Sequence, residues 1–139
     1  MCKRMTLILA ILLLLFSFEP LAISQGSWTK DSAGGHVSVG RQHMLGQPLY
    51  APASIPANAK VTRIQWHISL LNAAPPQHLV IKLCHARACQ QLDGLRGQFT
   101  PDSSWPANGS YYFIYSVETT GQLRPPLRVV RNGLTVNYN

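Results

Sequence analysis

The chain has 139 residues and a formal net charge of +7, with 46% hydrophobic and 12% charged residues. The basic residues are spread out, apart from Arg124, Arg128 and Arg131, and none of them interleave with aromatic residues. This distribution argues against a nucleic-acid-binding protein. The positive charge would suit an acidic partner, the cell wall or a membrane surface, although a solvated surface without a partner explains it more simply.

The N-terminus has the features of a secretion signal. Lys3 and Arg4 precede an almost wholly apolar run over residues 5–18, and small residues then mark a cleavage site after Ser24. The run is too short to span a bilayer, which takes roughly 20 residues. We therefore expect a signal peptide at residues 1–24, removed on export through the Sec pathway to the periplasm. The alternative is an uncleaved anchor helix.

Residues 25–139 then form one domain by length. A domain of this size buries roughly two-thirds of its unfolded surface, which is enough for a hydrophobic core. Ten Lys and Arg residues remain in it against four Asp and Glu residues, so its formal net charge is +6.

Strand signals begin weakly and then become clear. Residues 27–50 show short alternations, and the prolines at positions 48 to 56 mark an irregular loop. From Val61 to Leu70 apolar and polar residues alternate, with Trp66 in the apolar set. This period of two is typical of a half-buried strand.

Cys84 and Cys89 are the cysteines that follow residue 24, and thiol pairs in secreted proteins are normally oxidised. If they are bonded, they face each other across a four-residue loop and fix the register of a hairpin. The resulting pairs are Leu83 with Gln90, Lys82 with Gln91, and Ile81 with Leu92. We therefore expect the aliphatic residues on the core face and the disulfide on the more polar face. So small a loop contributes about 2 kcal/mol.

Residues 95–110 contain several glycines, prolines and an asparagine, and we expect them to form a long loop. Alternation resumes over residues 111–118. The odd-numbered residues from Tyr111 to Val117 share one face of this strand, and Tyr112 lies on the other.

The strongest short-range signal is Asn132-Gly133, between two apolar-rich segments. Asn-Gly tolerates the positive φ angles of a type I′ turn, so the sequence predicts a hairpin here. A two-residue turn would place Leu127, Val129, Val136 and Tyr138 on one apolar face.

Short strands, hairpins and proline-rich loops, without a convincing helical period, predict an all-β fold. We expect an antiparallel β-sandwich of short strands with hairpins and one disulfide.

The cysteine pair and the histidines are the candidate residues for redox or metal chemistry. The C-x4-C spacing differs from the C-x-x-C of redox enzymes. A metal held by Cys84, His85 and Cys89 would need reduced thiols and a fourth ligand. The five histidines show no ligand spacing, although a scattered metal site among them stays open. We expect neither a metal nor a cofactor.

No enzyme motif stands out. The chain lacks the Gly-x-Ser-x-Gly pattern of many hydrolases. A glycosidase needs two facing carboxylates, and Asp102 and Glu118 would meet only by chance. We therefore expect no catalytic residues and predict that the protein is not an enzyme.

The aromatic residues support a second hypothesis, a carbohydrate- or peptidoglycan-binding module of the cell wall. Exposed rings on a β-sandwich can stack on sugars. Alternation assigns Trp66 to the core, whereas Tyr112 and Trp105 are the better candidates for exposure.

An ordered series of short segments runs from about residue 61 to the end. It comprises Trp66, Leu70 to Asn72, Leu79-Val-Ile-Lys-Leu-Cys84, Cys89, Leu92-Asp93-Gly94, Phe113 to Tyr115, Gly121-Gln-Leu123, Pro126-Leu127, Asn132 and Val136-Asn137-Tyr138. In this series the chain resembles the FlhE family of flagellar proteins in Gram-negative bacteria. The loop at 95–110 departs most from the family.

The resemblance implies a periplasmic, non-enzymatic β-sandwich associated with flagellar assembly and swarming. The family is associated with limiting proton leakage through the flagellar export machinery, as a plug or a chaperone-like factor. We therefore expect partners among the flagellar rod or export-apparatus proteins, with possible cell-wall contact and no nucleic acid. The candidate contact residues, chosen for polarity near an expected exposed edge, are Tyr112, Arg124, Arg128 and Arg131.

Overall fold

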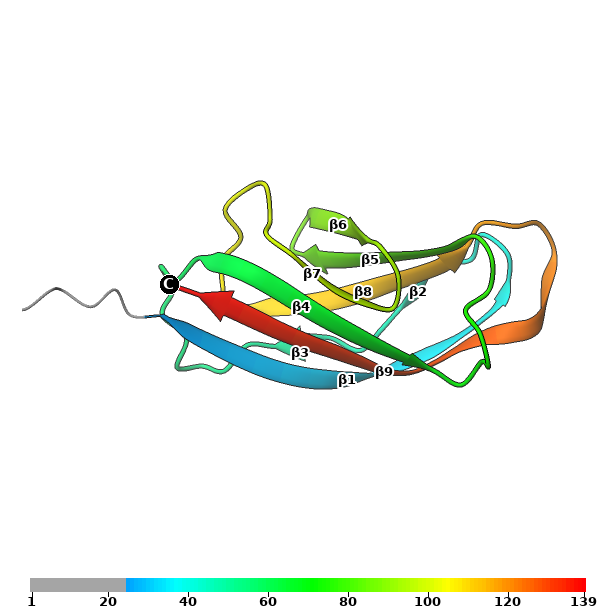
Figure 1. Cartoon of the computed structure of the whole chain (residues 1–139), viewed down its shortest axis with the longest axis horizontal. Coiled ribbons are helices and arrows are strands. Elements are labelled where there is room, and N and C mark those ends of the chain that lie inside the picture. Colours follow the sequence, from blue (N-terminus) through cyan, green and yellow to red (C-terminus); the bar gives the residue numbers. More distant parts are fainter. Residues whose placement is uncertain (1–24) are drawn as a thin grey trace, which may run out of the picture.

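The computed structural model describes residues 25–139, and Figure 1 shows their arrangement. The signal peptide predicted at residues 1–24 lies outside the described residues. Nine strands and no helix form within the described part: β1 (Gly26–Val39), β2 (Met44–Leu45), β3 (Leu49–Tyr50), β4 (Val61–Leu70), β5 (Leu79–His85), β6 (Ala88–Leu92), β7 (Arg96–Phe99), β8 (Ser110–Val117) and β9 (Gln122–Tyr138). This part of the chain accordingly holds no helix long and apolar enough to cross a membrane.

The strands form two antiparallel sheets. Sheet A has the order β1-β9-β4-β7, and sheet B has the order β2-β8-β5-β6, with β3 also paired to β8. The two sheets lie over one another along the length of the molecule (Figure 1). The predicted all-β antiparallel sandwich is confirmed.

The core lies between the sheets and is built by the alternations seen in the sequence. In β4, Ile64, Trp66 and Ile68 are buried, as the period of two predicts. In β8, the odd-numbered residues from Tyr111 to Val117 are buried, also as predicted. Glycines with φ near +85° make the turns at Gly94 and Gly121, where a side chain would strain the backbone.

The predicted Asn132-Gly133 hairpin is wrong. The two residues lie in the middle of β9, which is one strand of 17 residues paired with β1 on one side and β4 on the other. Asn132 is fully buried and accepts a hydrogen bond from the Tyr115 hydroxyl of the facing sheet. Its amide donates to Ser32 Oγ at 3.1 Å and to the Ala33 carbonyl at 3.2 Å. Contacts from distant strands therefore override the local turn preference.

A β-bulge explains why the predicted apolar face survives without the hairpin. Ser69 pairs with Arg131 and Leu70 pairs with Val129, so Val130 has no partner on β4. The extra residue shifts the alternation by one position, as a bulge does. Leu127 and Val129 before the bulge are therefore buried on the same side as Val136 after it.

The loop predicted at residues 95–110 contains a strand and a core residue. β7 (Arg96–Phe99) pairs with β4 at the edge of sheet A. Gly97 allows this pairing because a Cβ there would lie 2.7 Å from the Trp66 ring. Trp105, predicted as a candidate for exposure, is buried at 5% relative exposure and packs against the Phe99 ring.

Candidate functional site

The cysteine hairpin has the predicted register. Cys84 and Cys89 form a disulfide, with their Cα atoms 4.1 Å apart. The predicted pairs between β5 and β6 all form, and Ile81, Leu83 and Leu92 are buried. The disulfide points away from the core as predicted, but Cys84 itself is fully buried while Cys89 is exposed. β8 covers Cys84, because its other strand neighbour is Tyr112.

The structure does not bring the four predicted contact residues onto one surface. Tyr112 lies on the outer face of sheet B, beside the disulfide, and its hydroxyl donates to the Ala86 carbonyl at 3.4 Å. The three arginines belong to β9 in sheet A. Arg124 lies at the beginning of that strand, beside a hollow of about 300 Å³ between the β4–β5 and β8–β9 connections.

The expectation of an exposed edge is wrong for Arg128 and Arg131. β9 is an inner strand of sheet A, between β1 and β4. Where β4 ends, Asn72 takes its place: its side-chain oxygen accepts from the Arg128 N–H at 2.9 Å, and its amide donates to the Pro126 carbonyl at 3.0 Å. The Arg128 carbonyl accepts from the Leu71 N–H at 2.9 Å. The backbone of β9 is therefore paired here, and only side chains remain for contact.

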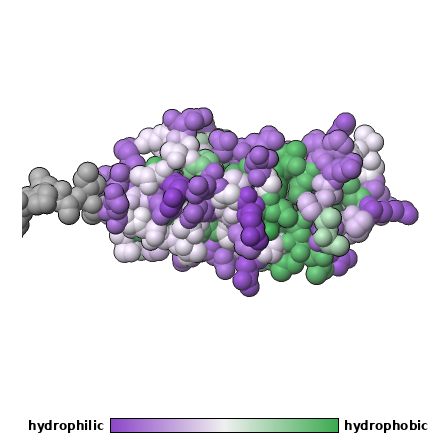
Figure 2. Space-filling model, viewed as in Figure 1, coloured by the Kyte–Doolittle hydropathy of each residue, from purple (hydrophilic) through white to green (hydrophobic). Residues whose placement is uncertain are grey.

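Those side chains form a mixed basic and apolar surface, which we call the arginine face. It is the outer face of sheet A around Arg128 and Arg131. Val130 lies between them in β9 and is 54% exposed, and Leu71 beside Arg128 is 65% exposed. Figure 2 shows an apolar area in the half of the molecule that holds the β4–β5 and β8–β9 connections, next to strongly hydrophilic side chains. Arginine is enriched at protein contact surfaces and at their energetic hot spots.

A groove of about 330 Å³ crosses the outer face of sheet A next to Arg131. Its floor includes Gly133, which pairs with Asp31 on β1 and with His67 on β4. A Cβ at Gly133 would lie 3.1 Å from the His67 carbonyl and 3.2 Å from Asp31 Oδ1. The missing side chain therefore gives the groove its depth.

The groove has charged groups on both sides. Arg131 Nη1 lies 3.7 Å from Asp31 Oδ2, with the two side chains 65% and 54% exposed. An exposed pair at this distance contributes little to stability. Across the groove Arg96 donates to His67 Nε2 at 3.0 Å. Because a guanidinium only donates, His67 Nε2 is the acceptor in this contact.

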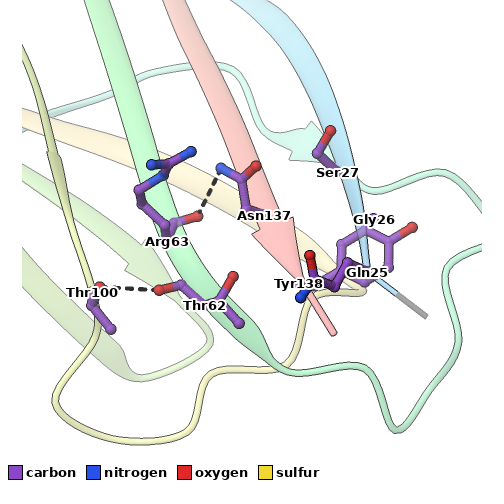
Figure 3. A pocket seen from close by; sticks show the side chains of 8 residues that line it. All are labelled: Gln25, Gly26, Ser27, Thr62, Arg63, Thr100, Asn137 and Tyr138. Carbon is purple, nitrogen blue, oxygen red and sulfur yellow. Dashed lines mark hydrogen bonds between the residues drawn. The ribbon is translucent and has the colours of Figure 1, made fainter. Parts of the chain in front are cut away.

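A second hollow lies where the ends of β1, β4 and β9 meet, with a volume of about 510 Å³. Figure 3 shows Tyr138 beside Gly26, with Arg63 and Thr62 across the sheet. The Asn137 amide donates to the Arg63 carbonyl at 3.4 Å, and Thr100 donates to the Thr62 carbonyl at 3.0 Å. The Asn137 amide and the Thr100 hydroxyl are thus occupied by contacts with the backbone of β4.

The buried aromatic residues do not form a sugar-binding platform. Trp28, Trp66 and Trp105 are at most 7% exposed. Tyr111 and Tyr115 are fully buried, and desolvation raises the pKa of each hydroxyl above its ordinary value. Among the described residues, no tryptophan therefore presents a ring on which a sugar could stack, as a carbohydrate-binding module requires.

Within residues 25–139, no three His, Cys, Asp or Glu side chains gather closely enough to share a metal ion. Every buried side-chain nitrogen or oxygen in that part of the chain has a hydrogen-bond partner.

Sequence reasoning missed Asp31, Gly133, Leu71 and Val130 as parts of the surface. Their proximity depends on the pairing of β1, β9 and β4, which lie far apart in the sequence. One local signal was available, because Gly133 and Asn132 could equally mark a close approach of backbones within a strand.

Comparisons with known proteins agree with this fold. A family model described as Flagellar protein FlhE matches residues 35–139. The chain is 33% identical over 118 residues to Flagellar protein FlhE of Yersinia enterocolitica, covering 84% of each. It is 33% identical over 126 residues to Flagellar protein FlhE of Escherichia coli (strain K12), covering 91% of this chain and 95% of that protein. A crystal structure of FlhE aligns with a TM-score of 0.75 at 28% identity, covering 84% of this chain and 98% of the other.

Proposed function

The chain belongs to the FlhE family of flagellar proteins, and we propose that it is a non-enzymatic periplasmic accessory protein that acts on flagellar assembly or export by protein contact. The family resemblance read from the sequence is confirmed. A periplasmic location is supported by the predicted signal peptide. It is also supported by the Cys84–Cys89 disulfide, since such bonds persist in oxidising compartments.

The proposed partners are rod or export-apparatus proteins of the flagellum. By binding them, the protein would limit proton leakage through the export apparatus and support swarming, as a plug or a chaperone-like factor. Family membership supports the link to the flagellum. The observation that carries the contact mechanism is the arginine face, where Arg128 and Arg131 flank the exposed Val130.

A charge-matched pull-down tests this proposal. Tagged protein is expressed in a flagellated strain that lacks its own copy, and the periplasmic fraction is recovered. We expect wild type to retain rod or export proteins, and the Arg128→Glu, Arg131→Glu variant to lose them. The control, Lys82→Glu with Arg87→Glu, reverses two charges around the β5–β6 hairpin of sheet B. Equal recovery of flagellar proteins by both variants would exclude the arginine face.

A further inference from the structure

The outer face of sheet A is strongly basic. Strand register and exposure place on it Arg63 from β4, Arg96 from β7, and Arg128 and Arg131 from β9. Asp31 is the acidic residue that the register places on this face within residues 25–139. Each guanidinium presents a planar fork of donors that matches a carboxylate. The charge of the face therefore complements an acidic ligand.

Asp31 already shows how a carboxylate would bind. It reaches across β9, with Oδ1 beside Gly133 and Oδ2 3.7 Å from Arg131 Nη1. That distance is longer than a hydrogen bond, and both side chains are more than half exposed. The Arg131 donors are therefore only loosely occupied, and an incoming carboxylate could replace Asp31 there.

The groove beside this pair is suited to an extended chain. Its lining includes Thr29, Gln65 and Thr135, which lie on three neighbouring strands. Thr29 and Thr135 hydrogen-bond to each other at 2.9 Å, so one of the two hydroxyl protons remains for a peptide carbonyl. The Gln65 amide donates to Gln98 at 3.5 Å, and its side-chain oxygen remains as an acceptor for a peptide N–H. At one end of the groove, Val130 offers an exposed aliphatic contact next to Arg131.

We infer that the groove on the outer face of sheet A binds an extended acidic protein segment, whose carboxylates take Arg131 and Arg128 and displace Asp31 from Arg131. In the free protein Asp31 is thus an internal competitor for the ligand. The inference deepens the proposed function by naming the chemistry of the partner segment, and it rests on that function for the segment's source.

A protein segment fits this face better than a membrane does. Peripheral membrane proteins insert aromatic or bulky apolar side chains among their basic residues. Here the three tryptophans are buried, and the exposed apolar side chains beside the arginines are the aliphatic Leu71 and Val130. The groove itself is lined mainly by polar side chains. An anionic membrane is the competing ligand that the experiment must distinguish.

The test measures binding of a fluorescein-labelled peptide of alternating glutamate and alanine by fluorescence anisotropy. An isosteric glutamine–alanine peptide serves as the neutral control. We expect only the acidic peptide to bind. Its affinity should fall steeply as salt shortens the Debye length from about 30 Å to about 8 Å. The same protein is also titrated with vesicles that contain phosphatidylglycerol.

Three variants separate specific binding from overall charge. Arg128→Gln with Arg131→Gln should weaken binding about tenfold, as the loss of two charge-assisted contacts would. Lys82→Gln with Arg87→Gln removes the same charge from the β5–β6 region and should change affinity less than about twofold. Asp31→Asn removes the competitor, leaves the backbone register in place, and should tighten binding by several-fold.

Misfolding would not raise peptide affinity, so tighter binding by Asp31→Asn is a result that a folding defect cannot produce. The inference would be overturned if the Arg128→Gln, Arg131→Gln variant and the Lys82→Gln, Arg87→Gln variant lost peptide affinity equally. Vesicle binding without peptide binding would also overturn it. An Asp31→Asn variant that binds no tighter than Asp93→Asn, which makes the same charge change at an exposed residue between β6 and β7, would also overturn it. If the peptide behaves as expected but the pull-down recovers no flagellar protein, the proposed function fails and the acidic-segment site stands.

Discussion

The buried contact between Asn132 and Tyr115 joins the two sheets and replaces the turn that the sequence predicts. The Tyr115 hydroxyl donates to Asn132 Oδ1, and both residues are fully buried. Replacing Asn132 by leucine keeps a similar volume but removes the side-chain amide and all of its hydrogen bonds. A turn asparagine in an exposed hairpin would tolerate the same change, so this substitution distinguishes the two structures.

The expected cost follows from the groups left without partners. Asn132→Leu leaves the Tyr115 hydroxyl buried and unpaired and removes two further hydrogen bonds, to Ser32 and Ala33. A buried polar group without a partner costs about 1–3 kcal/mol, so we expect Asn132→Leu to lower the free energy of unfolding by about 2–3 kcal/mol. Tyr115→Phe leaves Asn132 Oδ1 without its donor and should cost about 1–2 kcal/mol.

Urea unfolding of the four proteins in the double-mutant cycle tests this reasoning. In the double variant Asn132→Leu with Tyr115→Phe, neither side chain needs a hydrogen-bond partner. Its loss in the free energy of unfolding should therefore be smaller than the sum of the losses in the two single variants. We expect a coupling of at least about 1 kcal/mol. Additivity to within about 0.5 kcal/mol, or a near-neutral Asn132→Leu, would refute the role assigned to this contact.

Three further predictions concern the disulfide, the buried hydroxyls and the packing of β7. Cys84→Ser with Cys89→Ser should lower the free energy of unfolding by about 2 kcal/mol, and unchanged urea unfolding would remove the disulfide's stabilising role. Burial raises the pKa of Tyr111 and Tyr115 in the folded state, so their contribution to stability is complete below about pH 10 and is lost as pH rises beyond it. In absorbance at about 295 nm these two should ionise only as the protein unfolds; smooth titration of all the tyrosines in folded protein would contradict their burial. Gly97→Val drives a side chain into the tryptophan ring of β4 and should cost about 1–3 kcal/mol, measured by tryptophan fluorescence in urea, whereas an unchanged midpoint would show that β7 shifts freely.

Local patterns predicted the features that depend on residues close together in the sequence. The register of the Cys84–Cys89 hairpin followed from one covalent link and the pleat of a strand. The buried faces of β4 and β8 followed from their alternation. Each of these predictions needed only the residues of one strand or one hairpin.

The errors arose where distant strands decide the outcome. Asn132 lies within β9 because Ser32 and Tyr115, from two other strands, satisfy its amide. Gly97 was assigned to a loop because its contact with the Trp66 ring is invisible in a short window of sequence. Strand order also placed β9 inside sheet A, which removed the free edge expected beside its arginines.

The candidate surface was predicted in part for the same reason. Arg128 and Arg131 were found because they cluster along the chain. Asp31 was missed because it joins Arg131 only through the pairing of β1 with β9. Tyr112 was grouped with the arginines for its polarity, and the sandwich separates it onto the opposite sheet.

Site-specific photocrosslinking in living cells tests the central claim most directly. A photoreactive amino acid replaces Val130 on the arginine face, or Gln91 on the exposed face of β6 as the control. The account predicts that irradiation joins a flagellar rod or export-apparatus protein to the Val130 variant and not to the Gln91 variant. Adducts with flagellar proteins from Gln91 alone, or in equal yield from both positions, would contradict it.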